Sequence, residues 1–179
     1  MIPGIRPLLL PIAAWLCGCA ATTPPVAALA PAALANATYR TEFAAGGTAT
    51  LREGTYRERV VPNSATTTII GLGEQRAAGD LNGDGAPDAA VILVSDPGGS
   101  GTFYELAVVV NEEGRPRHAA SVLLGDRVNV LSLAIRSQIV TVELLYHETG
   151  DPLFCPRKRD ERSYRLEGDK LVSFWGMVP

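Results

Sequence analysis

The chain has 179 residues, of which 46% are hydrophobic and 20% charged, and its formal net charge at pH 7 is -3. This size and composition fit one globular domain preceded by a processed leader. The acidic excess gives no electrostatic reason to expect a nucleic-acid partner. The basic run over residues 157–159 is followed at once by Asp160 and Glu161. That order favours a solvated loop over a basic binding patch.

Residues 1–18 have the order of regions that is typical of a secretory signal peptide. The single cation Arg6 precedes an apolar run from Leu8 to Leu16, and small residues follow. The run is about half as long as the ~20 residues that a membrane-spanning helix needs. Removal of residues 1–18 leaves 15 basic and 19 acidic residues, and therefore a net charge of -4.

The cleavage site, Leu16-Cys17-Gly18-Cys19, resembles the bacterial lipobox, with an apolar residue at -3, a small residue at -1 and cysteine at +1. The resemblance implies that the Cys19 sulfur receives a diacylglycerol and that acyl chains anchor the mature protein to a membrane. Each buried methylene contributes ~0.8 kcal/mol to such an anchor. By the sorting rule of such proteins, Ala20 after the cysteine favours the outer membrane, facing the periplasm, over the inner one. An ordinary secretory signal cut near Ala20 is the alternative.

Residues 19–35 are rich in alanine, proline and threonine and carry no charge. This composition predicts a tether, extended in its proline-containing parts, that holds a domain away from the membrane surface. We expect a single β-rich domain over residues 36–179, which is long enough to bury a sizeable core.

From Asn36 onward, short apolar and β-branched segments alternate with turn-forming residues. This spacing predicts a mainly β fold, an antiparallel meander that forms an open or rolled sheet. One short helix is expected near residues 34–43, with Asn36 as its N-cap. Residues 48–51 and 55–57 are expected to form a hairpin. The remaining strands are expected at residues 66–72, 88–94, 103–110, 118–124, 128–135, 139–146, 163–166 and 170–175.

One segment, GDLNGDGAPDAAVILV at residues 79–94, gathers oxygen-bearing side chains at regular spacing. Glycines at 83 and 85 permit the positive φ angles of a tight loop. Calcium prefers six to eight hard oxygen ligands, so the loop predicts a calcium site with a structural role. The expected ligands are the side chains of Asp80, Asn82, Asp84 and Asp88 and the backbone carbonyl of Ala86.

The same loop has a metal-free interpretation, in which Asn and Asp side chains form Asx turns with their own backbone. Mutual repulsion between three close aspartates weakens that interpretation. Val91 stands where an EF-hand needs glutamate, which excludes that motif. The pattern resembles instead the calcium loop of integrin-type (FG-GAP) β-propeller repeats, and all five expected ligands match it one by one. Because the motif occurs once, a propeller is not implied.

Other candidate chemistry is sparse. His118 and His147 are the only histidines, which excludes a zinc site made of several histidines. After removal of the leader and lipidation of Cys19, Cys155 has no partner for an intrachain disulfide. We interpret Cys155 as a small buried hydrophobe; a reactive thiol with a neighbouring base is the alternative.

Over most of its mature length the chain is similar to a group of uncharacterised bacterial envelope lipoproteins. The resemblance implies secretion and a shared fold, without an assigned activity. We therefore expect a non-enzymatic, lipid-anchored envelope protein that acts as an accessory or binding module. An envelope hydrolase with an unidentified active site and an inhibitor or sensor module that binds an envelope protein are the alternatives. The matching stretches are NATYR at 36–40, GDLNGDGAPDAAV, GGSGTFYELAVV, LGDRV at 124–128 and the segment at 151–156.

Overall fold

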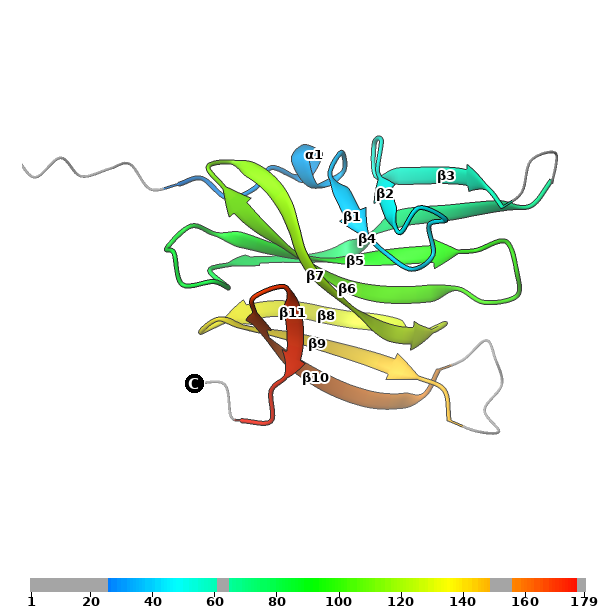
Figure 1. Cartoon of the computed structure of the whole chain (residues 1–179). Helices are drawn as coiled ribbons and strands as arrows, with labels where there is room; N and C mark the ends of the chain where they lie inside the picture. Colours follow the sequence, from blue (N-terminus) through cyan, green and yellow to red (C-terminus); the bar gives the residue numbers. More distant parts are fainter. Residues whose placement is uncertain (1–25, 61–64, 149–155, 177–179) are drawn as a thin grey trace, which may run out of the picture.

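The computed structural model describes residues 26–60, 65–148 and 156–176, which form one short helix and a series of antiparallel strands (Figure 1). The expected mainly β, meandering fold is confirmed. The elements are α1 (Pro31–Leu34), β1 (Thr38–Arg40), β2 (Thr48–Thr50), β3 (Thr55–Arg59), β4 (Thr67–Gly79), β5 (Asp88–Asp96), β6 (Phe103–Glu112), β7 (Arg115–Asp126), β8 (Asn129–Arg136), β9 (Ile139–Tyr146), β10 (Lys158–Glu167) and β11 (Lys170–Ser173).

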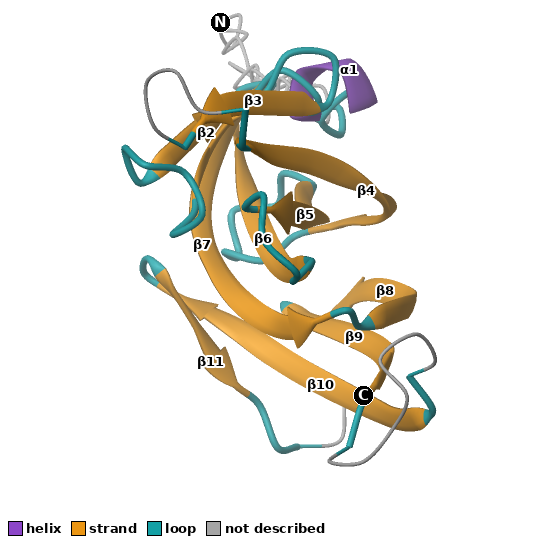
Figure 2. Ribbon diagram, turned by 90° about the vertical axis from the view of Figure 1, so that its right-hand side faces the viewer, coloured by secondary structure: helices purple, strands orange, loops and turns teal. Residues whose placement is uncertain are grey.

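The strands form two meanders and a small additional sheet. β3 to β7 make a five-stranded sheet in sequence order, β8 to β11 make a four-stranded sheet, and β1 pairs with β2. Consecutive strands therefore pair within each meander, as is usual in antiparallel sheets. Figure 2 shows β7 curving from the N-terminal elements toward the four-stranded sheet. Two register shifts between β6 and β7 accompany this bend, as β-bulges commonly do.

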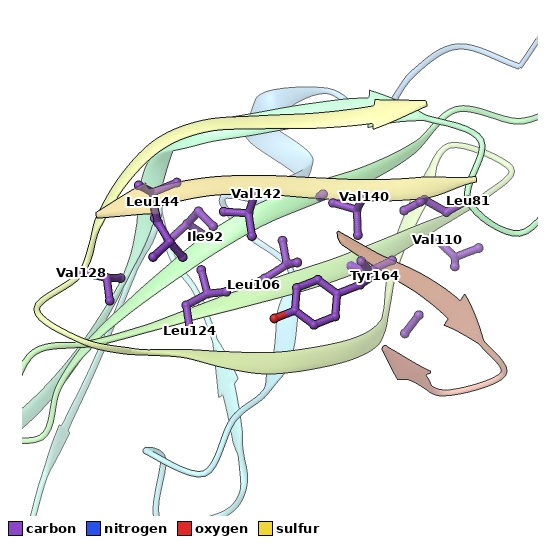
Figure 3. Packing of buried hydrophobic residues seen from close by; sticks show 14 residues of the cluster. Leu81, Ile92, Leu106, Val110, Leu124, Val128, Val140, Val142, Leu144 and Tyr164 are labelled. Carbon is purple, nitrogen blue, oxygen red and sulfur yellow. The ribbon is translucent and has the colours of Figure 1, made fainter. Parts of the chain in front are cut away.

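The two central strands of the five-stranded sheet, β5 and β6, are buried on both faces. Alternate residues of β5 and β6 pack in two separate hydrophobic clusters, one against the four-stranded sheet and one against α1, β1 and β2. Ile92 and Leu106 belong to the first cluster (Figure 3), whereas Val91 and Val109 belong to the second. This double burial explains why the run DAAVILV is apolar at consecutive positions rather than alternate ones.

The helix expected near residues 34–43 is wrong in its position. The chain is helical only over Pro31–Leu34, where the proline occupies the first turn, and Thr38–Arg40 forms β1. Asn36 lies beyond the helix, where its Nδ2 donates to the Ala32 carbonyl at 2.8 Å and its Oδ1 accepts from the Glu53 N–H. Tyr39 is fully buried in the cluster that α1, β1 and β2 form with the five-stranded sheet (the upper cluster), while Thr38 and Arg40 beside it are exposed. This alternation of buried and exposed residues is that of a strand with one covered face.

The hairpin expected from residues 48–51 and 55–57 is also wrong. β2 pairs with β1, and β3 pairs with β4; a single bridge between Arg52 and Thr55 is all that joins the two segments. The expected turn does form, with positive φ at Glu53 and Gly54. Beyond it the two strands diverge into different layers.

The folded domain begins before residue 36. Leu29 and Leu34 are buried in the cluster that covers the upper face of the five-stranded sheet. The tether expected over residues 19–35 therefore overlaps the domain from Leu29 onward. The expected leader, Cys19 and Cys155 lie outside the described residues. None of the helices in the described ranges has the length and apolar character needed to cross a membrane.

Two strands are longer than expected. β4 continues past a register shift between Leu72 and Arg76 and ends at Gly79. β10 includes most of the charged run that we interpreted as a loop, and it pairs with β9 from Lys158 onward. Its charged side chains are accommodated because they reach solvent, as in the ion pair between Arg159 and Glu143.

Gly79 marks a close approach between the two sheets. A Cβ atom built on this residue would lie 2.6 Å from Cγ2 and 2.9 Å from Cβ of Ile135 in β8. Only glycine fits this contact without displacement of the neighbouring strand. The contact sets the position of β8 beside the end of β4. The loop with the expected calcium ligands, residues 80–88, begins there, and we call it the calcium-type loop.

We expect Gly79→Ala to destabilise the domain by about 1–3 kcal/mol, the usual cost of overpacking. Urea denaturation of the chain from residue 20 onward, which retains every described residue, measures the change. Gly99→Ala is the matched control, because a Cβ there meets nothing within 4 Å. Equal stability of the two variants would contradict the assigned contact.

Candidate functional site

The loop with the expected calcium ligands connects β4 to β5 and is fixed to the core at both ends. The Leu81 side chain is buried in the cluster between the two large sheets (Figure 3). Asp88, the first residue of β5, is fully buried. The stretch between them, residues 82–85, is exposed. The loop therefore presents its central oxygen atoms to solvent on a rigid base.

Backbone N–H groups of the loop itself hold its side chains. Gly83 and Gly85 both have a φ of 83°, a conformation that suits glycine. The Asp80 carboxylate accepts hydrogen bonds from the Gly83 and Gly85 N–H groups at 2.7 and 3.0 Å. Asn82 Oδ1 accepts from the Asp84 N–H at 3.0 Å, and Asp84 Oδ1 accepts from the Ala86 N–H at 2.7 Å. These are the Asx turns of the metal-free interpretation.

The loop favours an ionised Asp84. A hydrogen bond from the Ala86 N–H and a second one from the Asn82 side-chain amide lower the pKa of its carboxyl group. Asn82 Nδ2 lies 2.8 Å from Asp84 Oδ2. The negative charge is therefore retained at neutral pH on the exposed side of the loop.

Within the described residues, no group of three or more His, Cys, Asp or Glu side chains is close enough together to hold a metal ion. Each carboxylate of the loop is directed to a backbone N–H instead. An ionised carboxylate offers about four acceptor positions, so these hydrogen bonds leave lone pairs for a cation. Carboxylate, amide and carbonyl oxygens are the donor types that calcium takes, and the calcium site remains a prediction.

Asp88 and Asn111 form a buried polar network that the sequence did not indicate as a pair. The Asp88 carboxylate accepts from the Leu81 and Asn111 N–H groups, both at 2.9 Å. Asn111 Nδ2 donates to the carbonyls of Ala27 and Pro87, and its Oδ1 accepts from the Gly114 N–H. The network ties the loop to the β6–β7 turn and to the N-terminal segment. Its one sequence signal is a polar residue at the end of the apolar run FYELAVVV.

A second group of buried polar side chains lies where β1 meets β6 and β7. Glu105 is buried and its Oε2 accepts from Thr41 Oγ1 at 2.6 Å. Burial raises the pKa of Glu105, an effect that the Thr41 hydrogen bond partly offsets. His118 and Arg40 line the same open cavity, of about 470 Å³. The sequence alone does not predict this group, because Thr41, Glu105 and His118 lie far apart along the chain.

His118 contacts Ser121, but its ring nitrogen donates to the serine hydroxyl instead of accepting from it. Arg40 Nε donates to His118 Nδ1 at 3.3 Å, so Nδ1 is an acceptor and Nε2 carries the proton. His118 Nε2 therefore donates to Ser121 Oγ at 2.8 Å, and Ser121 Oγ donates to the Arg40 carbonyl. A nucleophilic serine needs the reverse, a histidine nitrogen that accepts its proton. In this arrangement the cluster connects β1 to β7, and His118 does not act as an acceptor for the Ser121 hydroxyl proton.

The pH dependence of stability tests the surroundings of this partly buried histidine. Burial, together with the charges of Arg40 and Arg117, lowers the pKa of His118 to about 4. Between pH 6.5 and 4 the unfolded chain binds a proton at this residue that the folded chain does not, so stability falls as the pH falls. We expect His118→Gln to flatten that fall, measured by urea denaturation across this range.

Glu105→Gln should act in the opposite direction. Because the pKa of Glu105 is raised in the folded state, this residue contributes stability that is present at low pH and lost as the pH rises. Its removal makes the acid-side fall steeper. Parallel profiles for the parent and both variants would contradict the described burial of these groups.

The chain was compared with models of known families, with curated proteins and with solved structures, and it matches none of them.

Proposed function

We propose that the protein is a non-enzymatic, lipid-anchored protein of the cell envelope whose domain contains a structural calcium-binding loop. In this proposal it acts as an accessory or binding module. The observation that supports it best is the conformation of residues 80–88. The oxygen donors of Asn82 and Asp84 lie on an exposed turn that two positive-φ glycines form, with Asp80 half-buried at its start, shortly before a strand whose first six residues are buried.

The surroundings of the loop favour a structural role for the cation over a catalytic one. A Cβ atom on Gly83 would lie 3.3 Å from Gln138 Nε2, so the loop faces the β8–β9 turn. Gly79, at the loop entrance, contacts Ile135 of β8. A cation held by the expected ligands stiffens the loop between the two sheets. Gln138 and Ile135 supply no nucleophile.

Calcium titration tests the loop. We expect the chain from residue 20 onward to bind about one calcium ion, with a stabilisation of ~2.7 kcal/mol at a hundredfold excess over Kd. For a domain of this size each kcal/mol raises the melting temperature by roughly 2–4 °C. Magnesium should stabilise less, because it demands tighter octahedral geometry. Calorimetric titration and thermal melting measure these effects.

Asp84→Asn is the decisive variant, because its amide oxygen still accepts the Ala86 N–H while the charge of the ligand is lost. Without calcium it should melt slightly below the parent, because the hydrogen bond from Asn82 Nδ2 is lost, and it should lose most of the calcium-dependent shift. Asp96→Asn is the matched control, since the Asp96 carboxylate likewise accepts a backbone N–H, that of Gly98, outside the loop. If calcium leaves the parent unchanged, or shifts Asp84→Asn as much as the parent, the loop is only a turn.

Cys19→Ser tests the anchor. A serine oxygen cannot form the thioether, so the variant should lose acyl labelling and either remain unprocessed or leave the membrane fraction. Fractionation and metabolic acyl labelling measure the change, and Cys155→Ser, which leaves the lipobox intact, serves as the control. Normal acylation of Cys19→Ser would show that the acyl chains are attached at another residue, which would contradict the proposed anchor.

A further inference from the structure

The outer face of the four-stranded sheet has a floor of short side chains. Ala134 pairs with Thr141, and Thr141 pairs with Ser163, so these three residues form a row across β8, β9 and β10. Thr141 Oγ1 and Ser163 Oγ lie 2.8 Å apart and share a hydrogen bond. A cavity of about 530 Å³ lies over this row. The longer side chains of Arg136 and Glu161 also line it.

The chain that follows β11 lies beside this cavity. The Phe174 N–H donates to the Ser163 carbonyl at 2.8 Å, and the Arg165 guanidinium lies 5.0 Å from the centre of the Phe174 ring. A second cavity, of about 350 Å³, is lined by Phe174 and Trp175. The two cavities share Glu161, Ser163 and Gly176, so they adjoin, and the second also reaches Asp160, Arg162 and Tyr164. Together they define what we call the outer trough.

Trp175 is exposed to an extent that packing does not explain. Its side chain is 95% exposed, whereas the other large exposed hydrophobic residues of the described chain are 41–48% exposed. Phe174 beside it is held against the sheet by the two contacts above. The outer trough therefore ends at an aromatic ring that is free to stack on a ligand.

The charges of the outer trough are mixed. Arg136 and Glu161 are both exposed, and within the described residues neither forms a salt bridge or a side-chain hydrogen bond. One offers hydrogen-bond donors and the other acceptors, next to the hydroxyl groups of Thr141 and Ser163. This set suits a neutral ligand that both donates and accepts. A polyanion would meet Glu161 in a chain whose net charge is already -3.

We propose that the outer trough binds a saccharide chain. A pyranose with mostly equatorial hydroxyls has an apolar face of C–H groups, which stacks on Trp175, and a polar edge, which Arg136, Glu161 and the two hydroxyls bind. The cavities fall in the size range of small-ligand sites. An apolar peptide would leave the polar floor without partners, which is costly. The proposal gives a ligand class to the binding role proposed above, and it uses none of the calcium-loop residues.

Trp175 itself provides the test. The sequence has two tryptophans, at positions 15 and 175, so the chain from residue 20 onward contains Trp175 alone. We expect titration with the β-1,4-linked tetramers of glucose and of N-acetylglucosamine, and with glycan strands released from peptidoglycan, to change its fluorescence. At least one of these probes should shift the emission to shorter wavelength in a saturable manner. No response to all three would overturn the proposal.

Calorimetry with the bound probe then assigns the residues. Trp175→Ala should weaken binding at least about tenfold, and Trp175→Phe less, because a smaller ring still stacks. Glu161→Gln should weaken it several-fold through loss of a strong acceptor. Val60→Ala removes an exposed hydrophobic residue just after β3 and should bind like the parent. Binding that survives Trp175→Ala would overturn the proposal. Calcium-dependent melting of each variant shows separately whether the proposed loop is intact.

Discussion

Two adjacent strands, β5 and β6, have both of their faces buried, and most of the remaining structure follows from that constraint. A sheet with water on one side would leave either Val91 or Ile92 exposed, at ~25 cal/mol for each Å² of apolar surface. The N-terminal elements cover one face and the four-stranded sheet covers the other. At the strand ends the backbone is equally dry, so its polar groups need protein partners. Asp88 and Asn111 supply those partners.

The calcium-type loop therefore has a buried part that the fold requires and an exposed part that could bind a cation. Asp88 accepts two backbone N–H groups in the interior, a pairing that the fold needs with or without a cation. Asp84 and Asn82 lie on the exposed turn, where hydrogen bonds fix their orientation and leave acceptor positions free. Asp88 thus belongs to the ligand motif and to the buried network at once. A mutation of Asp88 would therefore change the stability of the fold together with any metal affinity.

The elements that local pattern determines were predictable: the strands from residue 88 to 146, the glycine turns and the oxygen donors of the loop. Strand pairing over longer distances was not. β2 pairs with β1 because Ala49 and Tyr39 share the upper cluster, and residues 48–57 alone carry no sign of it. The second half of β10 was expected, but its charged first half was missed because Lys158 to Arg162 lacks apolar alternation. Asn111 lies 23 residues beyond Asp88, so their contact required the fold. The outer trough likewise joins residues of three strands and the segment after β11.

The hydrogen bond between Asn111 and the Ala27 carbonyl determines where mechanical load would enter this domain. Under the proposed anchoring, Ala27 lies eight positions after Cys19, a reach of roughly 27 Å when fully extended. A force that pulls the domain away from the membrane would pass through this segment to Asn111. From Asn111 it would reach Asp88 and the two central strands. A cation in the adjacent loop would stiffen the attachment point itself. The outer face of the four-stranded sheet, on the far side of the central sheet from the N-terminal layer (Figure 1), would bear none of that strain.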